Sequence, residues 1–151
     1  MFDGSSAKRL DSSDFGWITT VRHDGQPQSS YVWFHFNGSD VLVISEPTSG
    51  KVRNITAHPM VSFHLDGDGT AGNGVLTMEG TAGLSAIADD PDRLALYMAK
   101  YGHRIRDDLE STPEHYAGHF ATAIRIEVDS VPWSGGLRIS VGSRVVINES
   151  C

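Results

Sequence analysis

The sequence predicts a mainly β fold, a small closed barrel with a few helices. Two dipeptides typical of tight β-hairpin turns, Asp24-Gly25 and Asn37-Gly38, separate apolar segments that resemble strands. About seven strand-like and about three helical segments follow one another without an internal repeat or a linker. A chain of 151 residues, 39% of them hydrophobic, is long enough to bury one core. We therefore expect residues 1–151 to form a single domain.

The first part of the chain predicts an antiparallel meander. Residues 1–14 are small and polar, and we expect them to form a flexible or helical arm. Three strands joined by the two tight turns are expected at 15–22, 28–36 and 41–45. From Tyr31 onward the second of these strands carries apolar or aromatic groups on both faces, which predicts that both faces are covered.

The segment after the third strand combines the start of a helix with two cations. Thr48 and Ser49 are both suitable N-caps. Lys51 and Arg53 then fall in the first helical turn, where the partial positive charge of the helix disfavours cations. An anion held there by backbone N–H groups and both side chains would remove this conflict. We interpret the segment as a phosphate-binding site, the alternative being that both cations are solvated surface residues.

The rest of the chain predicts four more strands and two more helices. Strands are expected at 60–65, 75–84, 121–128 and 137–147, helices at 91–101 and 112–119, and loops at 66–74 and 132–136. The helix after Ser49 is expected to have Val52, Ile55 and Thr56 on one face. Gly80 and Gly83 predict a bulge or a close approach of two backbones.

Composition and charge limit the classes of partner. A formal net charge of -7 argues against general affinity for nucleic acid or an anionic membrane. The only cysteine is Cys151, so no intrachain disulfide is expected. No apolar run approaches the length of a membrane span, and residues 1–15 lack the apolar centre of a signal peptide. We expect a cytoplasmic protein without a nucleic-acid or membrane partner.

Several other patterns do not reach the level of a functional site. His115 and His119 have the i, i+4 spacing of two metal ligands on a helix, but no third ligand completes a set, and we expect no metal. The glycines between Gly67 and Gly72 lack the strand-to-helix context of a dinucleotide fingerprint. No serine or cysteine is placed as a nucleophile. One face of helix 91–101 is typical of core packing rather than of a cofactor site: Leu94, Tyr97, Met98 and Tyr101.

A series of short segments occurs in a distinctive order along the chain. They are Gly16-Trp17-Ile18-Thr19-Thr20-Val21-Arg22, Asp24-Gly25-Gln26-Pro27-Gln28, Val32-Trp33-Phe34, Lys51-Val52-Arg53-Asn54-Ile55, Pro59, Val61 and Glu79-Gly80-Thr81-Ala82. In this order they resemble the flavin-binding split-barrel proteins related to pyridoxamine 5'-phosphate oxidase. The chain is most similar to the branch that uses the deazaflavin coenzyme F(420) in place of FMN. The resemblance covers residues 15–84 well and the remainder loosely.

The resemblance implies an FMN-binding-type split β-barrel that is a homodimer, with the cofactor in a groove at the subunit interface. It implies that Lys51 binds the cofactor phosphate, with Gly50 and Val52 beside it. The strand expected to run along the tricyclic ring consists of Gln28, Ser29, Ser30, Tyr31, Val32 and Trp33. Ile44 and Ser45 would lie behind the phosphate, and Trp133 would reach the groove from the second subunit. Gly50 stands where the vitamin-processing oxidases carry a second cation, so pyridoxamine phosphate oxidation is not implied.

Two classes of function follow from these observations. The first is an oxidoreductase in which reduced coenzyme F(420) delivers a hydride to a small conjugated substrate, with Tyr31 or Trp133 covering the substrate. FMN is the alternative cofactor, because both cofactors carry a phosphate. The second class is non-catalytic and comprises a flavin or deazaflavin carrier and a haem-binding split barrel, for which His35 or His64 would be the axial ligand.

Overall fold

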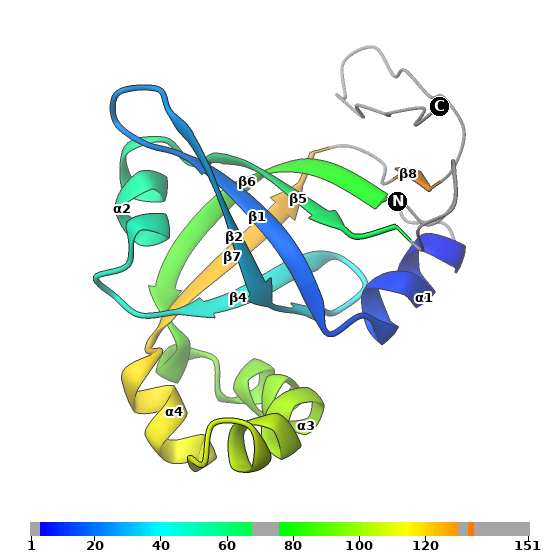
Figure 1. Ribbon diagram of the computed structural model, residues 1–151, viewed down its shortest axis with the longest axis vertical. Coiled ribbons are helices and arrows are strands. Elements are labelled where there is room, and N and C mark those ends of the chain that lie inside the picture. Colours follow the sequence, from blue (N-terminus) through cyan, green and yellow to red (C-terminus); the bar gives the residue numbers. More distant parts are fainter. Residues whose placement is uncertain (1–3, 68–75, 130–132, 135–151) are drawn as a thin grey trace.

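The computed structural model describes residues 4–67, 76–129 and 133–134, which form one curled antiparallel sheet and four α-helices (Figure 1). The first half comprises α1 (Gly4–Ser12), β1 (Phe15–Val21), β2 (Pro27–Trp33), β3 (His35–Phe36), β4 (Asp40–Ser45) and α2 (Gly50–Ala57). The second half comprises β5 (Met60–Leu65), β6 (Leu76–Ala86), a 3-10 turn (Ile87–Asp89), α3 (Pro91–Asp107), α4 (Pro113–His119), β7 (Thr122–Val128) and β8 (Trp133–Ser134). The predicted mainly β class is confirmed. The strand expected at 137–147 lies outside the described residues.

The sheet curls because one stretch of chain supplies both of its ends. The strand order is β2-β1-β5-β6-β7-β4-β3, so the first and last strands are consecutive in the sequence and only Phe34 separates them. We predicted one continuous strand at 28–36, and this was wrong at Phe34. The Phe34 N–H donates to the Tyr101 hydroxyl (2.8 Å), and its carbonyl accepts from Lys100 Nζ (2.9 Å). Because side chains of α3 satisfy this backbone, no strand partner is needed there.

The glycine predictions were partly confirmed. Gly25 and Gly38 adopt φ values of +90° and +96°, as the two predicted hairpin turns require. Gly80 lies where a Cβ atom would collide with the carbonyl oxygen of Glu127, so the expected close approach is present. Gly83 is different, because nothing lies within 4 Å of a Cβ atom built there and the residue pairs in regular register with Arg125. For Gly83 the prediction of a bulge or close approach was wrong.

Two apolar clusters share strand β4. The interior of the curled sheet contains sixteen buried hydrophobic residues, among them Phe34, Val41, Val43 and Phe63. The second cluster lies between the outer face of the sheet and the helices α3 and α4, and it includes Leu42, Ile44, Tyr97, Tyr101 and Tyr116. Alternate residues of β4 therefore enter different clusters, which explains its continuous apolar run Val41–Ile44. Figure 1 shows α3 and α4 together at one end of the sheet and α2 apart from them.

The helix beginning at Pro91 confirms one prediction and extends it. Helix α3 begins with Asp90 as N-cap and ends at Asp107, six residues beyond the predicted end. Tyr97 and Tyr101 are fully buried, and Leu94 and Met98 pack against the same cluster, as expected of a core face.

The loop expected at 132–136 is interrupted, because Trp133 and Ser134 form β8 beside β6.

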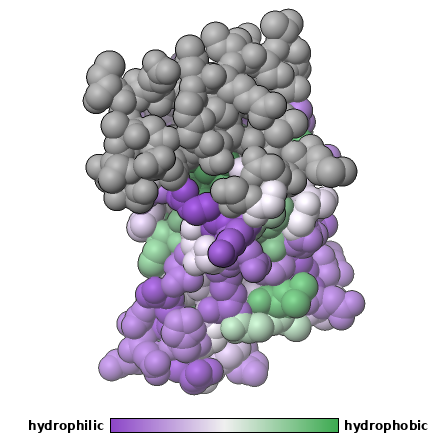
Figure 2. All heavy atoms as spheres, turned by 90° about the vertical axis from the view of Figure 1, so that its right-hand side faces the viewer, coloured by the Kyte–Doolittle hydropathy of each residue, from purple (hydrophilic) through white to green (hydrophobic). Residues whose placement is uncertain are grey.

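The outward face of the helical layer is mostly hydrophilic. Figure 2 shows a predominantly purple surface in its lower part, with one small green patch. Among the described helices, none is long and apolar enough to cross a membrane.

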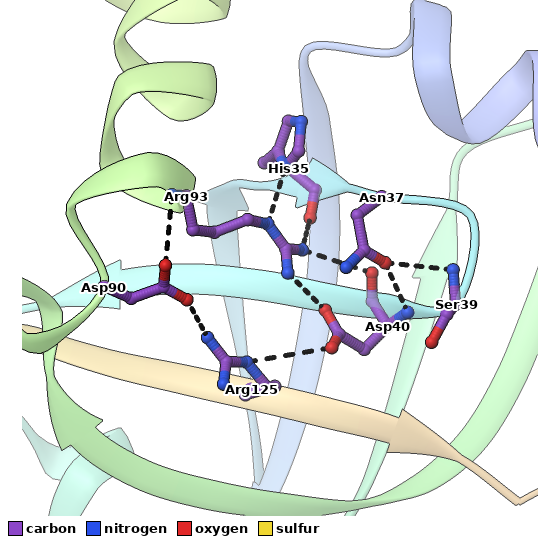
Figure 3. Close-up of polar contacts among 7 residues, drawn as sticks. All are labelled: His35, Asn37, Ser39, Asp40, Asp90, Arg93 and Arg125. Atoms are coloured by element: carbon purple, nitrogen blue, oxygen red, sulfur yellow. Dashed lines mark hydrogen bonds and ion pairs between the residues drawn. The ribbon is translucent and has the colours of Figure 1, made fainter.

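A buried arginine ties α3 to the sheet (Figure 3). Arg93 Nη1 lies 2.7 Å from Asp40 Oδ1, and Arg93 Nε donates to His35 Nδ1 at 2.7 Å. Arg125 joins Asp40 to Asp90, the N-cap of α3, with Nη2 at 2.7 Å from the Asp90 carboxylate. Burial, followed by the charge of Arg93, lowers the pKa of His35, so its ring is neutral and can accept the bond. The start of α3 is thereby fixed against β3 and β4.

We expect Arg93→Ala to lower the free energy of unfolding by about 3–5 kcal/mol, because it leaves the largely buried Asp40 carboxylate without its closest cation. Urea denaturation followed by circular dichroism measures this change. Arg106→Ala, which removes an exposed cation from the same helix, should change stability by no more than about 0.5 kcal/mol. Equal effects of the two substitutions would contradict the role given to Arg93.

Candidate functional site

A groove of about 430 Å³ opens where the end of β4, the edge of β2 and the helical layer meet. Its size falls in the range of roughly 300–1,000 Å³ that is usual for small-molecule and cofactor sites. The residues that line it are Phe15, Tyr31, Val32, Trp33, Ile44, Ser45, Glu46, Ser49, Lys51, Tyr97, Leu109, Tyr116 and Phe120. Most of these side chains are apolar or aromatic, and the hydroxyls and the two charged groups supply the polar contacts.

Helix α2 begins at the rim of this groove through a chain of hydroxyl contacts. Ser49 is the N-cap, and its hydroxyl accepts the N–H of Val52 at 3.3 Å. The Ser49 and Ser45 hydroxyl oxygens lie 2.7 Å apart, and the Ser45 hydroxyl donates to the Glu46 carbonyl at 3.2 Å. The N–H groups of Gly50 and Lys51 have no partner among the described residues. These two donors are therefore available to an anion at the helix start.

The two cations of the first turn do not converge on one site. Lys51 is partly buried and lines the groove, and burial lowers its pKa while the nearby Glu46 raises it. The Arg53 guanidinium turns back to the Thr48 carbonyl, with Nη1 donating at 2.6 Å. Arg53 lines a separate pocket that includes Arg22. Our expectation that both side chains would hold one anion was wrong, because Arg53 caps its own turn and Lys51 alone remains in the groove.

The rest of α2 agrees with the sequence in part. Ile55 is buried in the interior of the sheet and Val52 packs against the same cluster, as predicted. Thr56 is exposed and donates its hydroxyl to the Val52 carbonyl, so placing it on the buried face was wrong. Asn54 takes the buried position instead, and its Nδ2 donates to Thr20 Oγ1 at 2.9 Å.

Aromatic rings form the wall of the groove beneath strand β2. The Trp33 ring stacks on Tyr101 at 4.9 Å with an interplanar angle of 5°, and it also faces Tyr116 at 5.8 Å. The hydroxyls of Tyr97 and Tyr116 lie 3.0 Å apart. Burial raises the pKa of both phenols, so each keeps its proton at neutral pH. The wall therefore combines flat apolar surfaces with uncharged hydroxyl groups.

The predicted site residues divide between two adjoining pockets. Tyr31, Val32, Trp33, Ile44, Ser45 and Lys51 line the groove. Gln28, Ser29, Ser30 and Gly50 line a neighbouring pocket that also contains Lys51. Lys51 therefore stands between the two. The Gln28 side chain is directed toward Asn54, whose Nδ2 it accepts at 2.9 Å, and the Ser29 hydroxyl lies 2.8 Å from Thr19 Oγ1.

Val52 and Trp133 are the two remaining residues of the predicted cofactor site. The Val52 N–H is bound to the N-cap, and Val52 packs against the interior cluster. Trp133 pairs with Thr77 in the sheet. Its expected contribution across a subunit interface stays a prediction.

Several groove residues were missed as site residues in the sequence. Tyr97 was assigned to the core only, and the contributions of Phe15, Leu109, Tyr116 and Phe120 were not foreseen. Glu46 and Ser49 lie shortly before Lys51 in the chain, and this closeness was the signal that could have identified them as site residues. Tyr116 on α4 and Phe120, which directly follows this helix, lie far from Lys51 in the sequence, and no local pattern connects them to it.

Two of the histidines considered as metal or haem ligands, His119 and His35, contact side chains of this chain. His119 Nε2 lies 3.1 Å from Glu46 Oε1, and this carboxylate contacts His119 alone of the two histidines in the described contacts. No group of three or more His, Cys, Asp or Glu side chains among the described residues is placed to hold a metal. Neither His35 nor His64 lines the groove, and the Nδ1 atom of His35 is occupied by Arg93.

Comparisons with known proteins agree with the curled sheet. Residues 3–131 match the family model described as pyridoxamine 5'-phosphate oxidase, and the chain belongs to this family of split barrels. A conserved hypothetical protein from Mycobacterium tuberculosis is similar in fold, with a TM-score of 0.67, 24% identity, and 95% of this chain and 93% of that one covered.

Two further solved structures share the fold at lower identity. One is called an F420 reductase, with a TM-score of 0.62, 20% identity, and 82% of this chain and 92% of that one covered. The other is a haem storage protein from Vibrio cholerae, with a TM-score of 0.64, 19% identity, and coverage of 89% and 94%. At these identities the likeness shows the shared fold alone, so the ligand of this chain has to be inferred from its own groove.

We expect Ser49→Ala to destabilise the protein by about 1–2 kcal/mol, because it removes the N-cap of α2 and the contact with Ser45. Thermal or urea unfolding measures the change. Thr48→Ala is the matched control, since the Thr48 side chain is exposed and Ser49 is the N-cap; its effect should stay below about 0.5 kcal/mol. A larger loss from the Thr48 substitution would contradict this assignment of the cap.

Proposed function

We propose that this protein is an oxidoreductase that binds the deazaflavin coenzyme F(420) in the groove and uses its reduced form on a small conjugated substrate. The single observation that carries the proposal is the groove itself. It combines a helix start with two free N–H groups and a lysine at one end with stacked aromatic walls along its length. Membership of the pyridoxamine 5'-phosphate oxidase family supports the choice of a flavin-like cofactor.

The phosphate end of the groove fits a single phosphate group. Lys51 supplies the cation, and the N–H groups of Gly50 and Lys51 supply directed donors. The pKa of Lys51 is lowered mainly by burial, so an anion beside it would restore the stability of the charged ammonium. Ser45 and Ser49 are already bonded to each other and position the turn instead of contacting the ligand.

The ring end fits a flat, largely apolar group with a polar edge. Strand β2 pairs with β1 on one side only, so its other edge has backbone groups available between Gln28 and Trp33. Trp33 is held flat by Tyr101, and Ile44 supports the groove from the end of β4. When bound, the cofactor would supply hydride transfer. The residues of this chain bind it, orient it and exclude water around it.

The small number of charged side chains among the described groove residues agrees with this division of roles. Glu46 and Lys51 are the only acidic and basic residues among the described groove residues, and we assign Lys51 to the phosphate. The Tyr97 and Tyr116 hydroxyls remain as uncharged polar groups near the apolar wall. A conjugated substrate with few charges suits these surroundings. FMN remains the alternative cofactor, because the phosphate end suits both.

We further propose that the protein acts as a homodimer with the groove at the interface. The outer face of β1, β2 and β5 carries a row of aromatic side chains: Phe15 stacks on Tyr31 at 4.9 Å, and Trp17 lies 4.7 Å from the same ring. Tyr31 is 50% exposed and Met60 is 73% exposed in the single chain. A second subunit on this face would cover them. Analytical ultracentrifugation tests the proposal, and a monomer at micromolar concentration would contradict it.

We expect Lys51→Ala to weaken coenzyme F(420) binding by about 1.5–3 kcal/mol, the scale of a charge-assisted contact. Fluorescence titration of the purified protein measures the dissociation constant. Arg53→Ala is the matched control, because it removes a cation two positions away that faces the other pocket, and it should have a clearly smaller effect. Unchanged affinity in the Lys51 variant would show that Lys51 does not bind the cofactor. Independently, a haem absorption spectrum of the purified protein would contradict the proposed deazaflavin-dependent function.

A further inference from the structure

Two tyrosines in the wall of the groove form a hydroxyl pair. Tyr97 on α3 and Tyr116 on α4 both line the groove, and their hydroxyl oxygens lie 3.0 Å apart. Tyr97 is fully buried, and Tyr116 is 6% exposed. A hydrogen bond between the two hydroxyls uses one O–H donor, whereas the pair carries two. One O–H donor of the pair is therefore left over.

The described part of the chain offers no second acceptor to this pair. Apart from their mutual bond, neither hydroxyl makes a hydrogen bond to another described residue. The neighbouring Tyr101 is different, because its hydroxyl donates to the carbonyls of Asp14 and Phe34, each at 2.7 Å. Buried hydroxyl groups nearly always have hydrogen-bond partners. Since Tyr97 and Tyr116 line the groove, an acceptor atom in the groove would complete the pair.

Burial sets the direction of the bond between the two hydroxyls. Tyr97 is the more deeply buried residue, and Tyr116 is its hydroxyl's one partner among the described residues, so Tyr97 donates to Tyr116. The Tyr116 hydroxyl accepts this bond and keeps its own O–H for the groove. A hydroxyl that accepts a hydrogen bond becomes a stronger donor. Tyr116 is therefore the member of the pair that is placed to contact a ligand.

The surroundings of Tyr116 favour an uncharged acceptor. The Phe120 ring stacks on the Tyr116 ring at 4.5 Å, and the Trp33 ring faces it at 5.8 Å. Neither hydroxyl of the pair has a cation as a hydrogen-bond partner in the described part of the chain. A carboxylate bound here would lose its hydration without gaining a countercharge. A carbonyl oxygen loses less and gains one directed bond, and a flat conjugated frame suits the aromatic rings beside it.

We propose that the Tyr97–Tyr116 pair binds the carbonyl oxygen of the substrate, which makes α,β-unsaturated carbonyl compounds the substrate class of the groove. This inference rests on the proposed function and narrows it. Tyr116 donates to the carbonyl oxygen, and Tyr97 is a positioning residue that orients the Tyr116 hydroxyl.

The same hydrogen bond assists the reduction. When a hydride from the reduced coenzyme adds to the β-carbon of the substrate, a C–H bond forms and the carbon–carbon π bond breaks. Its electron pair moves toward the carbonyl oxygen, and a proton from water then completes the reduction at the α-carbon. The Tyr116 O–H stabilises the negative charge that develops on the oxygen, as donors in an oxyanion hole do.

Binding of a conjugated ketone in the presence of oxidised coenzyme F(420) tests this subsite without turnover, because the oxidised coenzyme has no hydride to give. The probes are benzylideneacetone and β-methylstyrene, which share a phenyl ring and an alkene, but only the first has a carbonyl. Their dissociation constants are measured with the wild-type protein, Tyr116→Phe and Tyr97→Phe. Difference infrared spectra of benzylideneacetone with an isotope label at its carbonyl carbon give the C=O stretching frequency, which falls when the oxygen accepts a hydrogen bond.

We expect Tyr116→Phe to bind benzylideneacetone roughly three- to tenfold more weakly, the effect of one neutral hydrogen bond, and to lose the downward shift of the C=O stretch. Tyr97→Phe should keep a smaller shift, because the Tyr116 O–H remains but is no longer oriented. β-Methylstyrene should bind the wild-type protein and both variants alike, since phenylalanine preserves the ring, and it thereby controls for damage to the groove.

Several outcomes would overturn the subsite and leave the proposed function intact. They are an unshifted C=O stretch in the wild-type protein, a shift that survives in Tyr116→Phe, and binding of neither probe by protein that holds coenzyme F(420). Weaker binding of coenzyme F(420) in Tyr116→Phe, with benzylideneacetone unaffected, would also overturn it and assign the hydroxyl to a carbonyl of the coenzyme ring. Failure of the wild-type protein to bind coenzyme F(420) would overturn the proposed function itself.

Discussion

The backbone of Phe34 is the constraint on which the groove depends. Its N–H and carbonyl bind side chains of α3, which interrupts the strand and sends its two halves, β2 and β3, to opposite ends of the strand order. The same Tyr101 that accepts the Phe34 N–H stacks on Trp33. One helix thus curls the sheet, covers the outer face of β4 and supplies part of the groove wall. The residues of α3 that bind the Phe34 backbone therefore belong to the same helix that supplies part of the groove wall.

The groove has a polar end and a mainly aromatic wall, to which we assign phosphate binding and ring positioning. At one end, the hydroxyls of Ser45 and Ser49 build the turn that presents Lys51 and the first N–H groups of α2. Along its length, Trp33, Tyr97 and Tyr116 offer flat surfaces, and burial raises the pKa of the two tyrosine hydroxyls, so both stay protonated. Glu46 and Lys51 are the only charged side chains among the described groove residues, and under the proposed function a cofactor would supply the chemistry. Family membership and the shape of the groove both support that proposal.

Local chemistry made much of the fold predictable. The turns at Gly25 and Gly38, the Ser49 cap and the buried face of α3 follow from backbone conformation, capping and periodicity. Other features depended on contacts between distant segments. The break at Phe34 needs Tyr101, sixty-seven residues away, and the direction of Arg53 was set by a carbonyl that no sequence pattern identifies. The groove residues predicted from the sequence lie on β2, at the end of β4 and at the start of α2, and the contributions of Tyr116 and Phe120 were missed.

The central claim is that this groove holds the phosphate and the ring of a deazaflavin. A crystal structure of the protein grown with coenzyme F(420) tests it most directly. The account predicts the phosphate beside Lys51 at the start of α2, and the tricyclic ring along the edge of β2 next to Trp33. A ring bound at any other surface, or a phosphate held in the separate pocket that Arg22 and Arg53 line, would contradict it.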